Sequence, residues 1–252
     1  MASGDLPRLD SKYFLQKIIM SIIAANLQAV EATIHAACAL AGRSKSEVLL
    51  LAVSKTFPAE AVVEAMTAGQ RAFGENYLQE ALDKMQEVAR LQPAVPVDWH
   101  FIGPIQSNKT RPIASSFQWV HTVERLKIAQ RLSEQRPPEL GPLDICLQVN
   151  ISGEASKSGA NEADVPVLAR QVSHLPNLRL RGLMAIPEAS TDPVQQRAAF
   201  ARLRALFDAL RAGGLPLDTL SMGMSGDLPA AVLEGATIVR VGSAIFGART
   251  YE

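Results

Sequence analysis

Residues 49–58, Leu49-Leu50-Leu51-Ala52-Val53-Ser54-Lys55-Thr56-Phe57-Pro58, form an apolar run that ends at a lysine and leads directly into a helical pattern. A run of this length and composition predicts a buried β-strand. A strand that stops at a lysine brings an amine to the rim of a sheet, where the carbonyl group of a ligand can condense with it. Lys55 is therefore a candidate Schiff-base lysine. The alternative is an ordinary solvated lysine at the end of a strand.

Strand-like and helical stretches alternate along the rest of the chain. The expected strands are 49–53, 71–73, 98–103, 118–122, 143–151, 178–186, 219–222 and 237–241, and the expected helices are 59–68, 78–91, 107–115, 124–135, 161–174, 194–211 and 228–234. A further helix precedes them, because apolar residues recur every three or four positions from Ile23 to Cys38 and Gly42 closes the pattern.

Eight strand-and-helix units with short connections and no break in composition predict an α/β fold, a single closed (β/α)8 barrel of the TIM type with an extra N-terminal helix. The competing fold is a doubly wound open sheet. Such a sheet usually carries a glycine-rich turn after its first strand, and residues 54–58 do not form one. In a barrel the functional site is built at the C-terminal ends of the strands, which is where Lys55 is expected.

The composition excludes several classes of function. The chain has 252 residues, of which 48% are hydrophobic, and this suits one barrel domain. Lys and Arg together number 25, as do Asp and Glu, so nothing predicts binding to nucleic acid or to an anionic membrane surface. Cys38 and Cys146 lie far apart and have no metal-binding spacing with the histidines. We expect no metal site, and a reducing cytoplasm as the location.

The first residues are expected to lie outside the barrel. The apolar stretch at 13–30 is interrupted by Gln16, Lys17 and Asn26, so it is too short for a membrane span, and no small-residue cleavage site follows it. The sequence is therefore divided into an N-terminal extension, residues 1–19, and a barrel domain, residues 20–252, with Met20 as an alternative beginning.

Small and polar residues also gather at the ends of other expected strands. Gly74-Glu75-Asn76 follows the second strand, His100-Phe101-Ile102-Gly103 lies at the third, and Gly182-Leu183-Met184-Ala185 lies in the sixth. Glycine at such a rim lets a ligand approach the backbone closely. The alternative is a set of tight turns that only join strand to helix.

The last two units predict a phosphate site. Ser221-Met222-Gly223-Met224-Ser225-Gly226-Asp227 leads into a helix, so Ser225 and the neighbouring N–H groups can face an anion. Arg240-Val241-Gly242-Ser243-Ala244 ends the eighth strand with a second glycine and hydroxyl. In barrels the loops after strands seven and eight commonly bind one phosphate together. We expect Asp227 to be a helix cap, whereas Ser225 can serve as a cap or as a phosphate ligand.

Arg240 alternates with Val239 and Val241, so its guanidinium points into the barrel if the valines pack outward against helices. A buried arginine needs an acceptor, either a carboxylate in a salt bridge at the strand end or the ring nitrogen of a pyridine cofactor. The histidines form no triad in the sequence, and His100 is expected to support the residues of the site from behind or to be a packing residue, without a catalytic role.

These motifs together resemble the YggS/PROSC-type pyridoxal 5′-phosphate (PLP) homeostasis proteins, a family of PLP-binding proteins, over residues 21–250. The resemblance rests on Leu51-Ala52-Val53-Ser54-Lys55, Phe73-Gly74-Glu75-Asn76-Tyr77, His100-Phe101-Ile102-Gly103 with Gln106, Asn108 and Lys109, Val149-Asn150-Ile151 with Ser156-Lys157-Ser158-Gly159, Gly182-Leu183-Met184-Ala185-Ile186-Pro187, Gly223-Met224-Ser225 with Asp227, and Arg240-Val241-Gly242-Ser243-Ala244-Ile245-Phe246-Gly247. With seven motifs in the same order, the probability of a chance similarity is very small.

The resemblance implies a barrel like the N-terminal domain of alanine racemase, in which Lys55 holds PLP as an internal aldimine. It also implies roles for five further residues. Ser225, Gly242 and Ser243 would bind the phosphate, Arg240 would face the pyridine nitrogen, and Asn76 would lie beside the cofactor ring. The departures from the family pattern are Gly226, at a variable position, and the N-terminal extension. Neither touches the inferred site.

Three functions are compatible with such a site. An arginine at the pyridine nitrogen disfavours its protonation, and an unprotonated ring is a weaker electron sink for carbanion chemistry. Racemases with this cofactor arrangement carry a second domain with a catalytic tyrosine, and this chain ends at Glu252, after the barrel. We expect a monomeric PLP carrier or buffer without catalytic residues, which contacts apo-enzymes transiently. The alternatives are a weak PLP-dependent enzyme of the amino-acid racemase type and a regulatory protein that PLP only stabilises.

Overall fold

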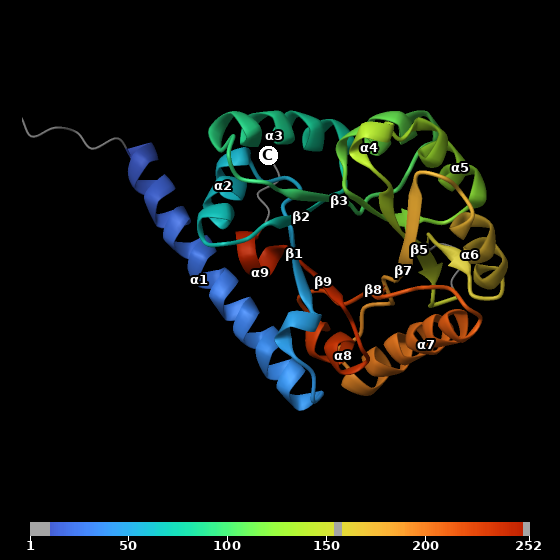
Figure 1. The fold of residues 1–252 in the computed structure, drawn as a ribbon. Helices are drawn as coiled ribbons and strands as arrows, with labels where there is room; N and C mark the ends of the chain where they lie inside the picture. The colour runs from blue at the N-terminus through green and yellow to red at the C-terminus, as the bar shows by residue number, and fades with distance from the viewer. Residues whose placement is uncertain (1–10, 154–157, 249–252) are drawn as a thin grey trace, which may run out of the picture.

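Eight parallel strands close into a barrel around the molecular axis, with helices on the outside (Figure 1). The structure is a computed structural model that describes residues 11–153 and 158–248, with side chains from Ile22 onward. The barrel strands are β1 (Leu49–Val53), β2 (Ala72–Glu75), β3 (Asp98–Phe101), β4 (Trp119–Val123), β5 (Leu143–Asn150), β7 (Leu178–Met184), β8 (Thr219–Ser221) and β9 (Ile238–Val241). The strands pair in the order β4, β3, β2, β1, β9, β8, β7 and β5, and β5 pairs in turn with β4. The ring of strands is therefore closed, and the predicted barrel is confirmed.

The helices follow the strands as the alternation predicts. They are α1 (Ser11–Leu40), α2 (Ala59–Thr67), α3 (Leu78–Leu91), α4 (Thr110–Ser116), α5 (Leu126–Gln135), α6 (Val165–Ser173), α7 (Pro193–Ala212), α8 (Leu228–Leu233) and α9 (Ser243–Phe246). Short 3₁₀ turns occur at η1 (Lys45–Glu47), η2 (Ser107–Lys109) and η3 (Pro138–Leu140), and β6 (Ala160–Asn161) pairs with the end of β5. Residues 107–109, which we expected to be α-helical, form the turn η2 instead.

The first helix is longer than its apolar pattern indicates. It begins at Ser11, so it crosses the expected boundary between residues 19 and 20, and that boundary stays a prediction. By length and composition, Ile22–Leu40 is apolar enough to span a membrane. Its buried residues, among them Ile23, Leu27 and Ile34, belong to the core, and α1 lies against α2, α8 and α9. About a third of this span, 33%, is buried, so α1 packs against the barrel helices along one face.

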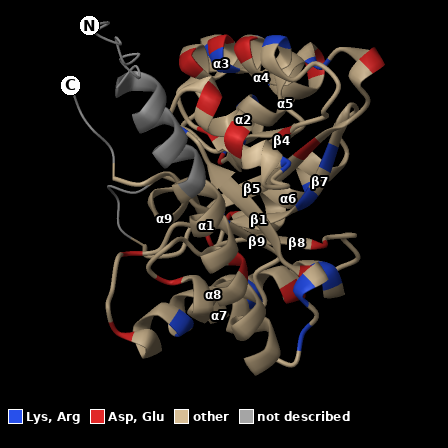
Figure 2. Ribbon diagram, turned by 90° about the vertical axis from the view of Figure 1, so that its left-hand side faces the viewer, with Lys and Arg blue, Asp and Glu red and all other residues tan. Residues whose placement is uncertain are grey.

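A small group of apolar side chains lies inside the barrel. Leu51, Ala72 and Ile238 form a separate buried cluster with Ile102 and Trp119, inside the ring of strands. The larger core lies between the strands and the helices, as expected for a barrel whose strands are buried on both faces. Acidic and basic residues are interspersed along α3 at the surface (Figure 2), in line with the balanced composition.

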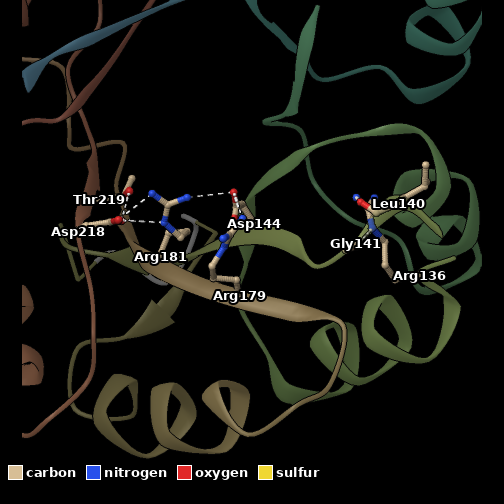
Figure 3. Close-up of polar contacts among 8 residues, drawn as sticks. All are labelled: Arg136, Leu140, Gly141, Asp144, Arg179, Arg181, Asp218 and Thr219. Atoms are coloured by element: carbon tan, nitrogen blue, oxygen red, sulfur yellow. Dashed lines mark hydrogen bonds and ion pairs between the residues drawn. The ribbon is translucent and has the colours of Figure 1, made fainter. Parts of the chain in front are cut away.

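An ionic network closes the barrel at the N-terminal ends of the strands (Figure 3). Asp144 of β5 accepts hydrogen bonds from Arg179 and Arg181 of β7, at 2.5 and 3.0 Å. Arg181 also donates to Asp218 at 2.7 Å, and its guanidinium lies 4.8 Å from the ring centre of Trp119. The network therefore joins β4, β5, β7 and the start of β8 at the end opposite Lys55.

Candidate functional site

A cavity of about 720 Å³ lies at the C-terminal ends of the strands. Its lining includes all six residues that the sequence singled out, namely Lys55, Asn76, Ser225, Arg240, Gly242 and Ser243. Arg240 lies in β9, and the other five come from the segments that follow β1, β2, β8 and β9. The structure thus brings together every residue of the predicted site.

Lys55 lies two residues beyond the end of β1, in a turn before α2. It is only partly exposed and contributes to the cavity wall, which argues against an ordinary solvated lysine. The following residue, Thr56, has a φ of 68°, in the left-handed region that β-branched residues rarely adopt. The turn around Lys55 therefore has an unusual backbone that neighbouring groups must hold in place.

The two loops expected to bind phosphate meet the same cavity. Gly242 follows β9, which pairs with β1, and a Cβ atom at this position would lie 3.1 Å from the carbonyl oxygen of Val53. Glycine therefore allows the β9 loop to lie close to the strand that carries Lys55. In the β8 loop, Asp227 occupies the N-cap position of α8, and its carboxylate accepts the N–H of Met224 at 2.5 Å. Asp227 thus stands at the expected cap position, but its side chain makes no capping hydrogen bond to α8 and instead stabilises the loop, in which Ser225 is exposed.

Arg240 is 4% exposed and donates from Nη1 to Ser221 Oγ at 2.8 Å and from Nη2 to the carbonyl oxygen of Ala185 at 2.9 Å. Within the described part of the chain no carboxylate forms a salt bridge with Arg240, and the acceptors of its two Nη atoms are neutral oxygens. Burial lowers the pKa of Arg240 to about 10, and the side chain is therefore a cation at neutral pH. The cavity wall accordingly contains a buried positive charge whose two Nη atoms are held by neutral oxygen atoms.

A hydrogen-bonded chain continues from Arg240 across the inside of the barrel. His121 Nδ1 lies 2.7 Å from Ser221 Oγ, and His121 Nε2 lies 2.8 Å from His100 Nδ1. Arginine can only donate, so Ser221 Oγ accepts from Arg240. The direction of the Ser221–His121 and His121–His100 hydrogen bonds depends on the tautomers of the two histidines.

His100 and His121 are both neutral at neutral pH. Burial lowers the pKa of His100 to about 3, and burial, His100 and Arg240 together lower the pKa of His121 well below its ordinary value. The His100 ring also stacks on Trp119, with 5.3 Å between ring centres. His100 is thus a packing residue, as expected. The place of His121 was not foreseen, although its position in β4 between Val120 and Thr122 is a signal for an inward-facing side chain.

Asn76 lies directly after β2, and its side-chain oxygen is buried without a hydrogen-bond partner among the described residues. Gly103 makes this position possible, because a Cβ atom there would lie only 2.2 Å from the carbonyl oxygen of Asn76. A buried amide oxygen without a partner in a cavity wall is available to a hydrogen-bond donor of a polar ligand.

The opposite side of the cavity has polar residues that the sequence analysis did not select. Thr122 donates to the carbonyl oxygen of Gly103 at 2.6 Å, and Gln148 donates to that of Ser158 at 3.3 Å. Glu124 accepts the N–H of Gly159 at 3.1 Å. These residues lie at or just beyond the ends of β4 and β5, and their position at strand ends is the signal that would have identified them.

Comparison with known proteins establishes the class. Residues 25–250 match the model of the alanine racemase N-terminal domain, and the chain has a barrel of that class. An alanine racemase of Clostridium difficile superposes with a TM-score of 0.69 at 13% identity, over 92% of this chain and 58% of the racemase, which shows the shared fold.

Closer relatives define the family. The chain is 65% identical over 232 residues to the pyridoxal phosphate homeostasis protein of Pseudomonas aeruginosa, covering 92% of this chain and 98% of that protein. It is 51% identical to the protein of the same name from Escherichia coli K12, covering 92% of this chain and 99% of that protein. The structure of PipY from Synechococcus elongatus with PLP bound has a TM-score of 0.77 at 37% identity and covers 89% of this chain and 100% of that one. The chain belongs to the pyridoxal phosphate homeostasis protein family.

Proposed function

We propose that this protein binds PLP covalently through Lys55 and takes part in intracellular PLP homeostasis, as a carrier or buffer that supplies apo-enzymes. One observation carries the proposal. A single cavity is lined by the strand-end amine of Lys55, by the buried cation of Arg240 and by the two loops that contain Ser225 and Gly242. Its volume of about 720 Å³ lies within the range of about 300–1,000 Å³ that is typical of small-molecule sites.

The residues present fit PLP. The amine of Lys55 can add to the aldehyde carbon, and a C=N bond then forms with the loss of one water. The loops at Ser225 and at Gly242–Ser243 would hold the phosphate, and the unpartnered amide of Asn76 would contact the ring or its substituents. Relatives named pyridoxal phosphate homeostasis proteins and the PLP-bound PipY structure support the same ligand.

Arg240 supports a role in carrying PLP over a role in catalysis. Its charge beside the pyridine nitrogen would disfavour protonation there, which limits the electron-withdrawing power that PLP supplies to enzymes. The likeness to alanine racemases shows only the fold and does not favour racemase activity. The buried free thiols Cys38 and Cys146 support a reducing, cytoplasmic location. We also propose that the protein is a monomer and contacts apo-enzymes transiently.

The test is an absorbance spectrum of the protein mixed with PLP, followed by borohydride reduction and peptide mapping. We expect a long-wavelength absorbance band and, after reduction, a pyridoxyl group on Lys55. The control variant Lys127→Ala, which changes an exposed lysine on α5, should give the same band and the same adduct on Lys55. A reduced protein without an adduct on Lys55 would overturn the proposal.

Two further assays separate a carrier from the other functions. A carrier restores the activity of a PLP-dependent apo-enzyme when mixed with it, whereas a protein that PLP only stabilises does not. A weak racemase catalyses exchange of the α-hydrogen of free amino acids in heavy water, and this exchange is lost in Lys55→Ala. We expect transfer to the apo-enzyme and no Lys55-dependent exchange.

A further inference from the structure

A buried ionic cluster lies directly behind the turn that carries Lys55. It consists of Ser54, Glu75, Glu80 and Lys84, and we call it the Lys84 cluster. Lys84 Nζ contacts Glu75 Oε1 at 2.6 Å, Glu80 Oε1 at 2.9 Å and the carbonyl oxygen of Ser54 at 2.7 Å. Ser54 Oγ donates to Glu75 Oε1 at 2.7 Å. All three donors of the Lys84 ammonium group are therefore used within the cluster.

The cluster holds both peptide groups that flank Lys55. On one side, the carbonyl oxygen of Ser54, which belongs to the peptide bond before Lys55, accepts from Lys84. On the other side, the N–H of Thr56, which belongs to the peptide bond after Lys55, donates to Glu80 Oε1 at 2.6 Å. The orientation of a side chain at its Cα atom follows from these two peptide planes. The Lys84 cluster thus determines the direction in which Lys55 leaves the backbone.

The conformation that is held in this way is unfavourable by itself. Thr56 has a φ of 68°, and a β-branched residue in this region persists only where its surroundings impose it. Two contacts hold this conformation. The N–H of Thr56 donates to Glu80, which is itself held by Lys84, and the N–H of Phe57 donates to the carbonyl oxygen of Ser54 at 3.1 Å. The turn is therefore kept in a strained shape next to the reactive amine.

Stability alone is a poor explanation for these contacts. Lys84 is 6% exposed and Glu75 is 0% exposed, and Glu75 Oε2 has no hydrogen-bond partner within the described residues. Burial raises the pKa of Glu75, although the neighbouring Lys84 opposes this change. Apolar residues of similar volume often replace a buried ion pair without loss of stability. What such residues lack is the ability to hold the Ser54 carbonyl group and, through Glu80, the Thr56 N–H group.

We propose that Lys84 is a positioning residue which, through Glu75 and Glu80, orients Lys55 toward the cavity for covalent attachment of PLP. This inference rests on the proposed function. It adds three residues of β2 and α3 to the site, none of which lines the cavity.

Two substitutions at Glu80 give the sharpest test, because this residue is half-buried and its loss leaves the core intact. Glu80→Gln retains an oxygen that accepts from Thr56, whereas Glu80→Ala does not. We expect Glu80→Ala to slow the reaction of Lys55 with PLP at least tenfold, and Glu80→Gln to react within about twofold of the unchanged protein. Circular dichroism of the bound PLP band should fall in the same order, because it reports a fixed cofactor orientation. Equal rates for Glu80→Ala and the unchanged protein would overturn the proposal.

A second test removes the charges at the centre of the cluster. Lys84→Met combined with Glu75→Gln leaves no unpaired buried ion, so urea unfolding should stay close to that of the unchanged protein. Acetic anhydride labelling of Lys55 in the PLP-free double variant, measured against exposed Lys127 as internal reference, should still change at least threefold. Arg197→Met, which breaks an exposed ion pair with Glu234, is the control and should change neither quantity. Unchanged labelling of Lys55 in the folded double variant would refute the positioning role.

The two proposals fail in different ways. If the unchanged protein forms no PLP adduct on Lys55, the proposed function is wrong. If the unchanged protein forms the adduct and the Glu80 and Lys84 variants form it equally fast, only the role of the Lys84 cluster is wrong.

Discussion

Lowering the pH should destabilise this protein through His100, and the size of the effect follows from its burial. The pKa of His100 is lowered from 6.5 to about 3 in the folded protein, because burial penalises the charged ring. Between these values the unfolded chain binds a proton that the folded protein does not bind. The free energy of unfolding therefore falls as the pH drops below about 6.5, whereas His100 causes no loss of stability above that value.

The expected loss at pH 4.5 is roughly 2–3 kcal/mol for His100 alone, at about 1.4 kcal/mol for each pH unit of difference in proton binding. This figure depends mainly on the unfolded state, because the folded ring stays neutral at pH 4.5 for any folded pKa below about 4. His121 adds a loss of the same sign, since its pKa is also lowered.

The assay is urea unfolding at pH 8 and pH 4.5 for the unchanged protein and for His100→Asn. The asparagine amide can accept a hydrogen bond from His121 Nε2 through its oxygen or donate one through its nitrogen, and it does not titrate. Between the two pH values the unchanged protein should lose about 2–3 kcal/mol more than His100→Asn. His35→Asn, at an exposed position of α1, is the control and should behave like the unchanged protein. If His100→Asn loses as much stability as the unchanged protein, His100 is not a buried neutral histidine.

Three other predictions test the fold and the site. In urea unfolding, Gly182→Ala should lower the free energy of unfolding by about 3 kcal/mol or more, because its Cβ atom would lie 1.7 Å from the carbonyl oxygen of Thr219. The control Gly226→Ala, which has open space around it, should change this free energy by less than about 0.5 kcal/mol, and equal effects of the two substitutions would contradict the close contact between β7 and β8. Glu64 is buried, one of its carboxylate oxygens has no partner among the described residues, and burial raises its pKa to about 7. The folded protein therefore binds the extra proton between pH 4.5 and 7, so Glu64→Gln should stabilise by roughly 1–2 kcal/mol at pH 8 and by little at pH 5, and a gain at pH 5 as large as at pH 8 would show that ionisation is not the cause. Lys55→Ala should abolish the long-wavelength band yet still bind PLP weakly through its phosphate in equilibrium dialysis, and complete loss of binding would show that the loops at Ser225 and Gly242 contribute little.

The barrel and the six residues around the cavity were predictable because their signals are local. A strand with both faces buried appears as a continuous apolar run, and a helix repeats its apolar residues every three or four positions. Lys55, Gly242 and Ser243 stand directly after such runs, and a barrel places all strand ends at one rim. Order along the chain and one rule of topology were therefore sufficient to bring these residues together before any distance was known.

The polar contacts inside the barrel needed the tertiary structure. His121 and Ser221 are 100 residues apart, and only the closure of the sheet brings their side chains within 2.7 Å. Lys84 has the pattern of a surface lysine on an amphipathic helix, yet it is buried because α3 places it over Ser54, 30 residues earlier. The start of α1 at Ser11 was likewise not visible in the apolar pattern, which begins only at Ile23.

The sequence by itself thus determined the barrel and placed Lys55 and the two glycine-containing loops at the rim that lines the cavity, because backbone periodicity, glycine and strand ends are properties of short segments. Only the tertiary structure decided which partners hold Arg240 and Lys55 in place. Burial makes those hydrogen bonds obligatory, and it is the packing of distant strands and helices that supplies their acceptors.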